Sequence, residues 1–331
     1  MKTYIIAEMA CSHEGNKDKA KIIIDASGKA GADAIQFQIW ALDKMLVPNH
    51  KDYQNLVKIE MSPVIWKELA SYVRDKYKAM EMIACVYEKD SVDLSEQMNV
   101  DAYKIHSSDL SNPYLIKCVA KTGKRIDLCV GASSLDEIQM AISWIKQTSQ
   151  SKIWLMYGYQ NFPTKTNEIN MSYMTKLKQL FELPVGYQDH TDAESDAAFW
   201  LPALARGMGI DIIEKHITHD RSFKGFDHEA ALNPNEFESF ITMIRTIEDA
   251  MGRSIPGPFS EEELIYRKYS KKSLVARHDI SKNSILSEND IIPMRTNELG
   301  LAPDKIPLLV GKKTNRNIVA FEKIGMKDCI S

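Results

Sequence analysis

The chain has 331 residues, of which 44% are hydrophobic and 26% charged, and its formal net charge is -3 at pH 7 with a pI near 6.3. This length fits one α/β domain of about 250 residues plus a small second domain, and the composition is that of a globular protein rather than a disordered or fibrous one. The charge and the lack of a basic run argue against nucleic acid as a partner, and no segment resembles a signal sequence or a membrane span, so we expect a cytoplasmic protein.

Short apolar runs alternate with amphipathic stretches of helical period through the first 250 residues. The eight runs are TYIIAE, DAIQFQI, EMIACV, AYKIHS, RIDLCV, KIWLMY, PVGYQD and DIIEKH. Such alternation predicts βα units and a parallel sheet. Helix-start signals lie between the runs at Asn16, at Ser62-Pro63 and at Ser134, which precedes Glu137 as in a capping box. Eight units predict a (β/α)8 TIM barrel; the alternative, an open doubly wound sheet, lacks its frequent glycine-rich fingerprint.

The pattern changes after Gly252. The segment RSIPGPFSEEELIYRKYSKK is rich in proline, glycine and charge, as in a connector with a short helix inside it. The last 60 residues break into short β-like pieces separated by turn residues. We therefore expect a barrel domain at 1–252, a linker at 253–271 and a β-rich domain at 272–331 that is too small for a large core.

The five cysteines are widely spaced and never form a Cys-x-x-Cys pair. They predict neither a disulfide framework nor a zinc knuckle. Cys11, Cys85 and Cys129 fall near the ends of predicted strands, where a catalytic thiol is one option. The favoured interpretation is that they are small buried residues.

Polar residues gather at the predicted C-terminal strand ends and the loops that follow them, where barrel enzymes carry their reacting groups. They include Glu8, His13, Glu14, Gln36, Gln38, Lys104, His106, Ser107, Asp109, Gln160, Asn161, Asp189, His190, Glu214, His216, His219, Asp227 and His228. Lys104 could be a Schiff-base amine, although an anion-binding or structural lysine is the favoured interpretation. The segment from Gly131 to Ser134 could present N–H groups to an anion, although an ordinary helix cap is favoured.

Two histidines three residues apart, His216 and His219, raise the question of a metal site. Side chains alternate along a strand, so Glu214 and His216 share a face and can point into the barrel mouth, whereas His219 lies in the loop beyond. His190 is the natural second imidazole, because neighbouring strands lie about 4.8 Å apart. Two imidazoles with open positions suit manganese, cobalt or zinc, but the spacing equally allows two strand-end histidines bonded to neighbours.

Several motifs resemble those of the sialic acid synthases and their pseudaminic and legionaminic acid synthase relatives. They are IIAEMACSHEGN, AGADAIQFQ, AYKIHSSDLSN, FPT, GYQDHT and IIEKHITHDRSFKGFDHEAALNP, followed by a terminal module similar to an antifreeze-like (SAF) domain. The resemblance covers nearly the whole chain. It implies condensation of phosphoenolpyruvate with the aldehyde of an N-acylated amino sugar, which gives a nine-carbon 2-keto acid and phosphate. The implied cofactor is a divalent metal, usually Mn2+, with Co2+ or Mg2+ as alternatives.

The resemblance also implies roles for matching residues. His190 and His216 would hold the metal, Glu14 would manage protons near a metal-bound water, and Asp227 would assist at the sugar end. The substrate contacts would come from Gln36, Gln38, Lys104, Ser107, Asp109, Gln160, Gln188 and Arg295. Of these, Lys104 and Ser107 match positions that hold phosphoenolpyruvate. Arg295 matches an arginine that reaches the sugar's acyl group in a neighbouring subunit, which implies a domain-swapped homodimer.

Some positions depart from the family's pattern. Gln36 stands where the family has lysine, Cys85, Cys129 and Gln188 stand where it has hydroxyl residues, and Asp109 replaces a glutamate. Replacing lysine by glutamine removes a charge-assisted contact of about 1.5 to 3 kcal/mol. Two alternatives to the synthase therefore stay open. One is an aldolase, lyase or isomerase that uses a donor other than phosphoenolpyruvate, and the other is a non-catalytic sugar-binding protein.

Overall fold

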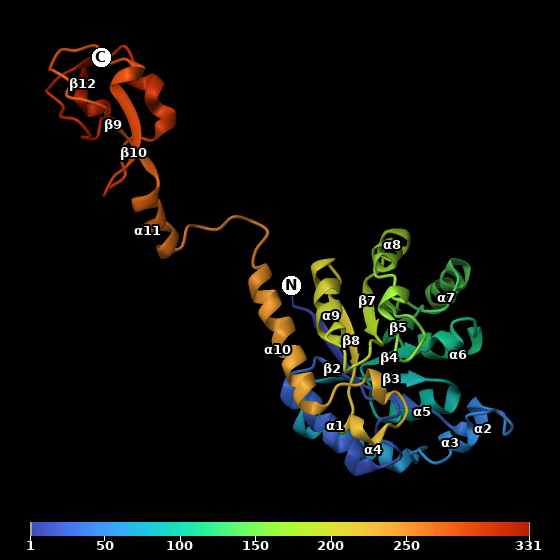
Figure 1. Cartoon of the computed structure of the whole chain (residues 1–331). Coiled ribbons are helices and arrows are strands. Elements are labelled where there is room, and N and C mark those ends of the chain that lie inside the picture. Colours follow the sequence, from blue (N-terminus) through green and yellow to red (C-terminus); the bar gives the residue numbers. More distant parts are fainter. Residues whose placement is uncertain (1, 331) are drawn as a thin grey trace. The chain divides into compact units, whose positions relative to one another are not determined.

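The computed structural model describes residues 2–330, which divide after Gly252 into two compact units. Unit 1 is a closed barrel of eight parallel strands that neighbour one another in chain order, with β8 pairing back to β1 (Figure 1). The strands are β1 (Tyr4–Glu8), β2 (Ala34–Ile39), β3 (Glu81–Val86), β4 (Ala102–Ile105), β5 (Arg125–Cys129), β6 (Ile153–Tyr157), β7 (Val185–Asp189) and β8 (Ile212–His216). The predicted TIM barrel is confirmed, and its closure excludes the open sheet.

Helices follow the strands around the outside of the barrel (Figure 1). They are α1 (Lys17–Ala30), α4 (Pro63–Lys76), α5 (Lys89–Gln97), α6 (Pro113–Ala120), α7 (Leu135–Thr148), α8 (Ser172–Phe181), α9 (Ala197–Gly207) and α10 (Pro234–Met251), with short α2 (Leu42–Met45) and α3 (Tyr53–Leu56) before α4. The predicted caps are present. The Asn16 side chain accepts from two amides, Ser62 accepts from the Ile65 amide, and Ser134 and Glu137 form a reciprocal capping box. The segment at Gly131 thus ends in an ordinary helix cap.

The barrel interior consists of an apolar layer below a polar one. Inward-facing Ile6, Ala34, Ile83, Ala102, Met156 and Ile212 form a buried cluster. Because side chains alternate, the residue two places further along a strand faces inward again, nearer the C-terminal end. On five of these strands that residue is Glu8, Gln36, Cys85, Lys104 or Glu214, and all five are buried. The larger hydrophobic core lies on the other face of the sheet, between strands and helices.

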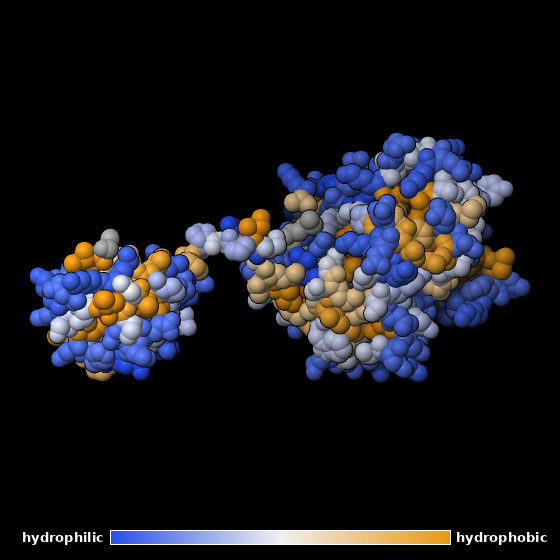
Figure 2. Space-filling view, turned by 90° about the horizontal axis from the view of Figure 1, so that it is seen from above, coloured by the Kyte–Doolittle hydropathy of each residue, from blue (hydrophilic) through white to orange (hydrophobic). Residues whose placement is uncertain are grey.

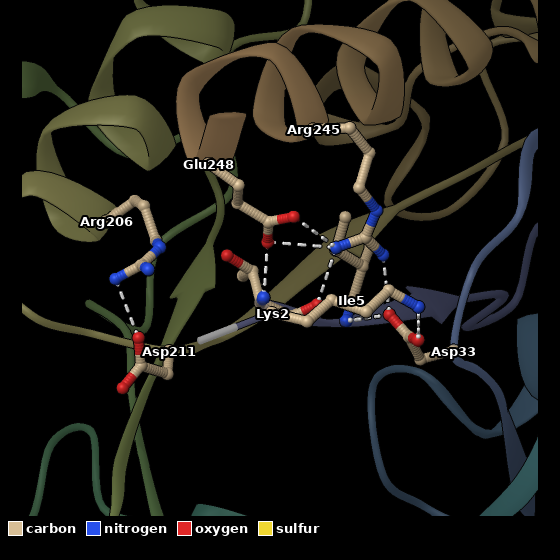
Figure 3. Close-up of polar contacts among 8 residues, drawn as sticks. Lys2, Ile5, Asp33, Arg206, Asp211, Arg245 and Glu248 are labelled. Atoms are coloured by element: carbon tan, nitrogen blue, oxygen red, sulfur yellow. Dashed lines mark hydrogen bonds and ion pairs between the residues drawn. The ribbon is translucent and has the colours of Figure 1, made fainter. Parts of the chain in front are cut away.

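A cluster of ionic contacts ties β1, β2 and α10 together at the N-terminal end of the barrel (Figure 3). Asp33, just before β2, accepts hydrogen bonds from the Ile5 amide at 3.0 Å, from Arg245 at 2.8 Å and from Lys2 at 2.6 Å. Arg245 also contacts Glu248 at 3.0 Å. These contacts fix the position at which the last helix of the unit meets its first strand.

Unit 2 begins with α11 (Glu261–Ser270) and continues as a small module of β9 (Lys272–Ala276), β10 (Ile291–Arg295), β11 (Lys313–Thr314) and β12 (Cys329–Ile330). β9 pairs with β10 and β11 with β12, both antiparallel. The module packs around eight buried hydrophobic residues, including Leu274, Ile291 and Ile318, which matches the small β-rich domain expected. Figure 2 shows hydrophobic patches on the visible face of each unit. Among the described residues, no helix combines the length and apolarity needed to cross a bilayer.

Candidate active site

Lys104 occupies the centre of the polar layer, between two carboxylates. Its Nζ lies 2.7 Å from Glu214 and 3.4 Å from Glu8, and all three side chains are buried. Burial alone lowers the pKa of Lys104, but the carboxylates of Glu214 and Glu8 outweigh it and raise that pKa. Burial raises the pKa of Glu8 to about 8. This raised pKa favours the ammonium form of Lys104 and argues against its acting as a Schiff-base amine.

An uncharged hydrogen-bonded chain extends from Glu214 across the layer. Gln188 Nε2 donates to Glu214 at 3.0 Å, and the Cys129 thiol donates to Gln188 Oε1 at 2.9 Å. The hydrogen-bonded chain ends at Gln160, whose Nε2 donates to the Cys129 sulfur at 3.5 Å. Burial raises the pKa of the Cys129 thiol, so this side chain is a neutral donor rather than a thiolate nucleophile.

Gln36 is fully buried, yet neither its amide nitrogen nor its amide oxygen has a hydrogen-bond partner among the described residues. It lies opposite Glu8 in the β1–β2 register. Oε2 of Glu214, also buried, is unpaired in the same way. Buried polar groups are seldom left unpaired, so these atoms mark positions where a bound molecule would complete the hydrogen bonding.

His190 and His216 face each other at the mouth, with ring centres 5.3 Å apart, and the Phe162 ring packs 4.2 Å from His190. The Nδ1–H of His190 donates to the Tyr159 carbonyl at 2.8 Å, which leaves Nε2 with its lone pair free. Nδ1 of His216 is buried without a partner. Burial lowers the pKa of both rings and keeps them neutral.

This histidine pair fits a divalent metal ion. Neutral imidazoles are the ligating form, and a carbonyl bound to the second ring nitrogen is the usual support of a ligating histidine. Within residues 2–330, no group of three or more His, Cys, Asp or Glu side chains is arranged to hold a metal. The two rings would therefore leave the other coordination positions to water or substrate.

The β1–α1 and β8–α10 loops meet beside this mouth. A Cβ atom on Gly225 would lie 2.7 Å from Glu14 Oε1 and 3.0 Å from His228 Nε2, so a side chain at this position would displace the Glu14 carboxylate. Lys19 pairs with the Glu14 carboxylate. Asp227 has a left-handed backbone conformation, with φ at 62°, and burial raises its pKa to about 6. A carboxyl group with this pKa can exchange a proton near neutral pH.

The remaining predicted residues form no hydrogen bond or ion pair with the Lys104 side chain in the part of the chain that the structure describes. Ser107 and Asp109 form a short 3-10 turn after β4, where Asp109 accepts from Asn112 at 2.9 Å. Gln38 accepts from the Tyr87 hydroxyl at 3.2 Å. Arg295 lies on β10 in unit 2.

Three contributors were absent from the predicted substrate, metal and catalytic set: Glu8, Glu214 and Phe162. For Glu8 and Glu214 the signal was present in the sequence, since both are charged residues at the ends of otherwise apolar strands. Phe162 lies in the FPT motif, but the sequence does not indicate its role, which follows from the packing of its ring against His190.

Two family models match the chain, the NeuB family over residues 23–256 and the SAF domain over residues 271–322. An N,N'-diacetyllegionaminic acid synthase of Legionella pneumophila is 30% identical, over 97% of this chain and 92% of that protein. An N-acetylneuraminate-9-phosphate synthase of Homo sapiens is 29% identical, over 94% and 88%. The crystal structure of an N-acetylneuraminic acid synthetase from Leptospira borgpetersenii in complex with citrate superposes with a TM-score of 0.72 at 28% identity, over 81% of this chain and 92% of that one.

Proposed function

Because the chain belongs to the NeuB family and has an SAF domain after its barrel, we propose that it condenses phosphoenolpyruvate with the open-chain aldehyde of an N-acylated amino sugar. The methylene carbon of the donor bonds to the aldehyde carbon, one water is consumed, and a nine-carbon 2-keto sugar acid and phosphate are released. The observation that carries the proposal is the pair of neutral, facing histidines directly above a buried lysine–carboxylate layer. The synthase names of the similar proteins support it.

His190 and His216 would hold a divalent ion, for which we propose Mn2+, with Co2+ or Mg2+ as alternatives. Bound there, the ion would polarise the aldehyde carbonyl. Phe162 limits the access of water to the two rings, because it packs against His190 and lies 6.0 Å from His216. The support for this assignment is the free lone pair on His190 Nε2 and the unpaired His216 Nδ1.

The chain's own residues divide the remaining work. Lys104, as the buried ammonium, binds the carboxylate of the three-carbon donor. Ser107, three positions further along the chain, contacts the same donor. Gln36 offers its unpaired amide to the same molecule. Glu14 and Asp227 hold or accept protons at the acceptor end, Asp227 with a pKa near neutrality. Gln38, Asp109, Gln160 and Gln188 line the substrate positions.

We also propose a homodimer in which Arg295 of one chain completes the site of its partner. Unit 2 supports an associated state because Ile285, Leu308, Val310 and Ile330 are all exposed and line one hollow of about 600 Å3. Exposed hydrophobic side chains gathered around a hollow are typical of a contact surface.

The test is phosphate release from phosphoenolpyruvate on addition of N-acylated amino sugars to Mn2+-loaded protein. The wild type should release phosphate only with an acceptor present, and His216→Ala should abolish the release and weaken Mn2+ binding in a titration followed by electron paramagnetic resonance. A matched control is His50→Leu, a change at an exposed loop histidine. Full activity in His216→Ala would refute the assignment.

One observation favours a second candidate, an aldolase that uses pyruvate. Lys104 is the one cation in the polar layer among the described residues, and Glu214 already pairs with it at 2.7 Å. A phosphate ester would add at least one further negative charge, and the described part of the layer has no second cationic side chain to pair with it. With pyruvate, the methyl carbon adds to the aldehyde, and neither water is consumed nor phosphate released. Keto-acid formation from pyruvate without phosphate release would favour this candidate.

A further inference from the structure

Two histidine nitrogens with no partner lie on neighbouring rings of the loop that follows β8, apart from the pair His190 and His216. They are His219 Nε2 and His228 Nδ1, each buried and without a hydrogen-bond partner among residues 2–330. The His228 side chain is fully buried. Leaving such atoms unpaired is costly, so their clustering indicates a group that is supplied from outside the chain.

The hydrogen bonds of His219 and His228 define what each ring offers. Nδ1 of His219 lies 3.1 Å from the Ser12 carbonyl, which can only accept, so Nδ1 carries the proton and Nε2 of the neutral ring is an acceptor. Nε2 of His228 lies 3.3 Å from the Thr218 hydroxyl.

That hydroxyl already accepts from the Asp220 amide and finds no other acceptor in the described chain, so it donates to His228 Nε2. Nδ1 of His228 is then an N–H donor. The pair therefore presents one acceptor and one donor.

The separation of the two rings matches a single oxygen atom. Their centres are 5.9 Å apart and their planes meet at 74°. An oxygen that hydrogen-bonds to both would lie roughly 4 Å from each ring centre, so the rings are close enough for one oxygen to be within reach of both. Only a hydroxyl or a water can donate to one ring and accept from the other.

The surroundings favour a sugar over a charged group. Phe223 lies 5.1 Å from His219 and exposes 59% of its surface, which provides an apolar face for the C–H groups of a polyol. Glu14 is close enough to both histidines to interact electrostatically with them, and Lys19 is paired with Glu14. His228 also lines a hollow of about 260 Å3, where the cations Arg221 and Lys224 are accompanied by the acidic Asp192, Glu194 and Glu229, so this corner has room without an excess of positive charge.

We infer that His219 and His228 together bind a free hydroxyl group of the acceptor sugar, at the end of its chain away from the aldehyde. The inference rests on the proposed function, which places the aldehyde at His216. His219 follows His216 by three positions, which span at most roughly 10 Å of chain, and this reach is sufficient for an extended six-carbon sugar.

The two histidines would discriminate between acceptor sugars by the group on their terminal carbon. A 6-deoxy sugar would leave both ring nitrogens unpaired and buried. A 6-phosphate could not donate to His219 when fully ionised and would face the Glu14 carboxylate. The structure thus assigns this chain to acceptors with an unmodified terminal hydroxyl.

The test measures binding by calorimetry with open-chain alditols, which lack the aldehyde and cannot react. N-acetylmannosaminitol should bind the wild type about ten-fold more tightly than its 6-deoxy and 6-phosphate analogues. His219→Leu should weaken binding of the parent alditol by about ten-fold and leave the 6-deoxy analogue unchanged. His219→Gln, whose side-chain oxygen still accepts, should restore most of the difference, and the control His50→Leu should change nothing.

Equal affinity of the wild type for the parent and 6-deoxy alditols, or no binding of any alditol, would overturn the inference. So would an equal loss for all alditols in His219→Leu, which indicates a merely structural role. A failure of the proposed function would look different: alditol binding would depend on the hydroxyl, yet no carbon–carbon bond would form with either donor.

Discussion

At the scale of single residues, the binding of an anionic donor in the polar layer depends on how many positive and negative side chains the layer contains. Lys104 pairs with Glu214, Glu8 keeps its proton near neutral pH because burial raises its pKa to about 8, and Gln36 adds hydrogen-bonding capacity without charge. The affinity of this site for a phosphorylated donor should therefore change when the uncharged side chain of Gln36 is replaced by a charged one.

Gln36→Lys should tighten phosphoenolpyruvate binding by about ten-fold, because it adds a charge-assisted contact beside Glu8 and Lys104. Pyruvate affinity should change much less, since a monoanion already matches the single ammonium group. Calorimetry on Mn2+-loaded protein measures both. The control is Gln54→Lys in α3, where the side chain is exposed. If the variant bound phosphoenolpyruvate no better than the wild type, Gln36 would not face the donor.

Asp227 predicts the acid limb of the pH profile. Burial raises its pKa to about 6, and its ionised form is the one that accepts a proton. We expect kcat/KM to rise with pH through about 6 and to level off above it. Asp227→Asn should lose most activity and also lose this limb, while Mn2+ binding stays unchanged. A flat profile in the wild type between pH 5 and 7 would remove Asp227 from the proton-transfer role.

At the scale of elements, the strands and caps were predictable and the contacts between their side chains were not. Apolar runs fix the strands, and Asn16, Ser62 and Ser134 start helices where their side-chain oxygens reach backbone amides. The pairing of His190 with His216 followed from alternation and strand order. The hydrogen bond from His190 to the Tyr159 carbonyl did not, because it depends on the path of the loop after β6.

Asp33 is the point where β1, β2 and α10 are held together, and it predicts a loss of stability. Asp33→Ala would leave the Ile5 amide without its side-chain acceptor and would remove one of the carboxylates that Arg245 contacts, in a mostly buried position. We expect the free energy of unfolding to fall by about 2 to 3 kcal/mol in urea denaturation. Asp43→Ala, at an exposed position in α2, should change it by less than about 0.5 kcal/mol. Similar losses in both variants would show that the cluster contributes little.

At the scale of the whole molecule, the proposed exchange of Arg295 between chains can be tested by mixing two inactive variants. His216→Ala keeps Arg295, and Arg295→Ala keeps His216. If Arg295 acts across the dimer, mixed dimers contain one complete site, so an equal mixture after subunit exchange should recover about a quarter of wild-type activity. Recovery should be absent if each chain uses its own Arg295.

Two buried cysteines of the barrel can report chemically on how often the barrel mouth opens. The Cys85 and Cys129 side chains are buried and face the polar layer, so an alkylating reagent can reach their sulfurs only when the barrel mouth opens. Their rate of modification in the native protein therefore measures that opening. A molecule that binds above Lys104 should slow the modification in proportion to its occupancy, which offers a label-free screen for donors and acceptors that does not depend on turnover.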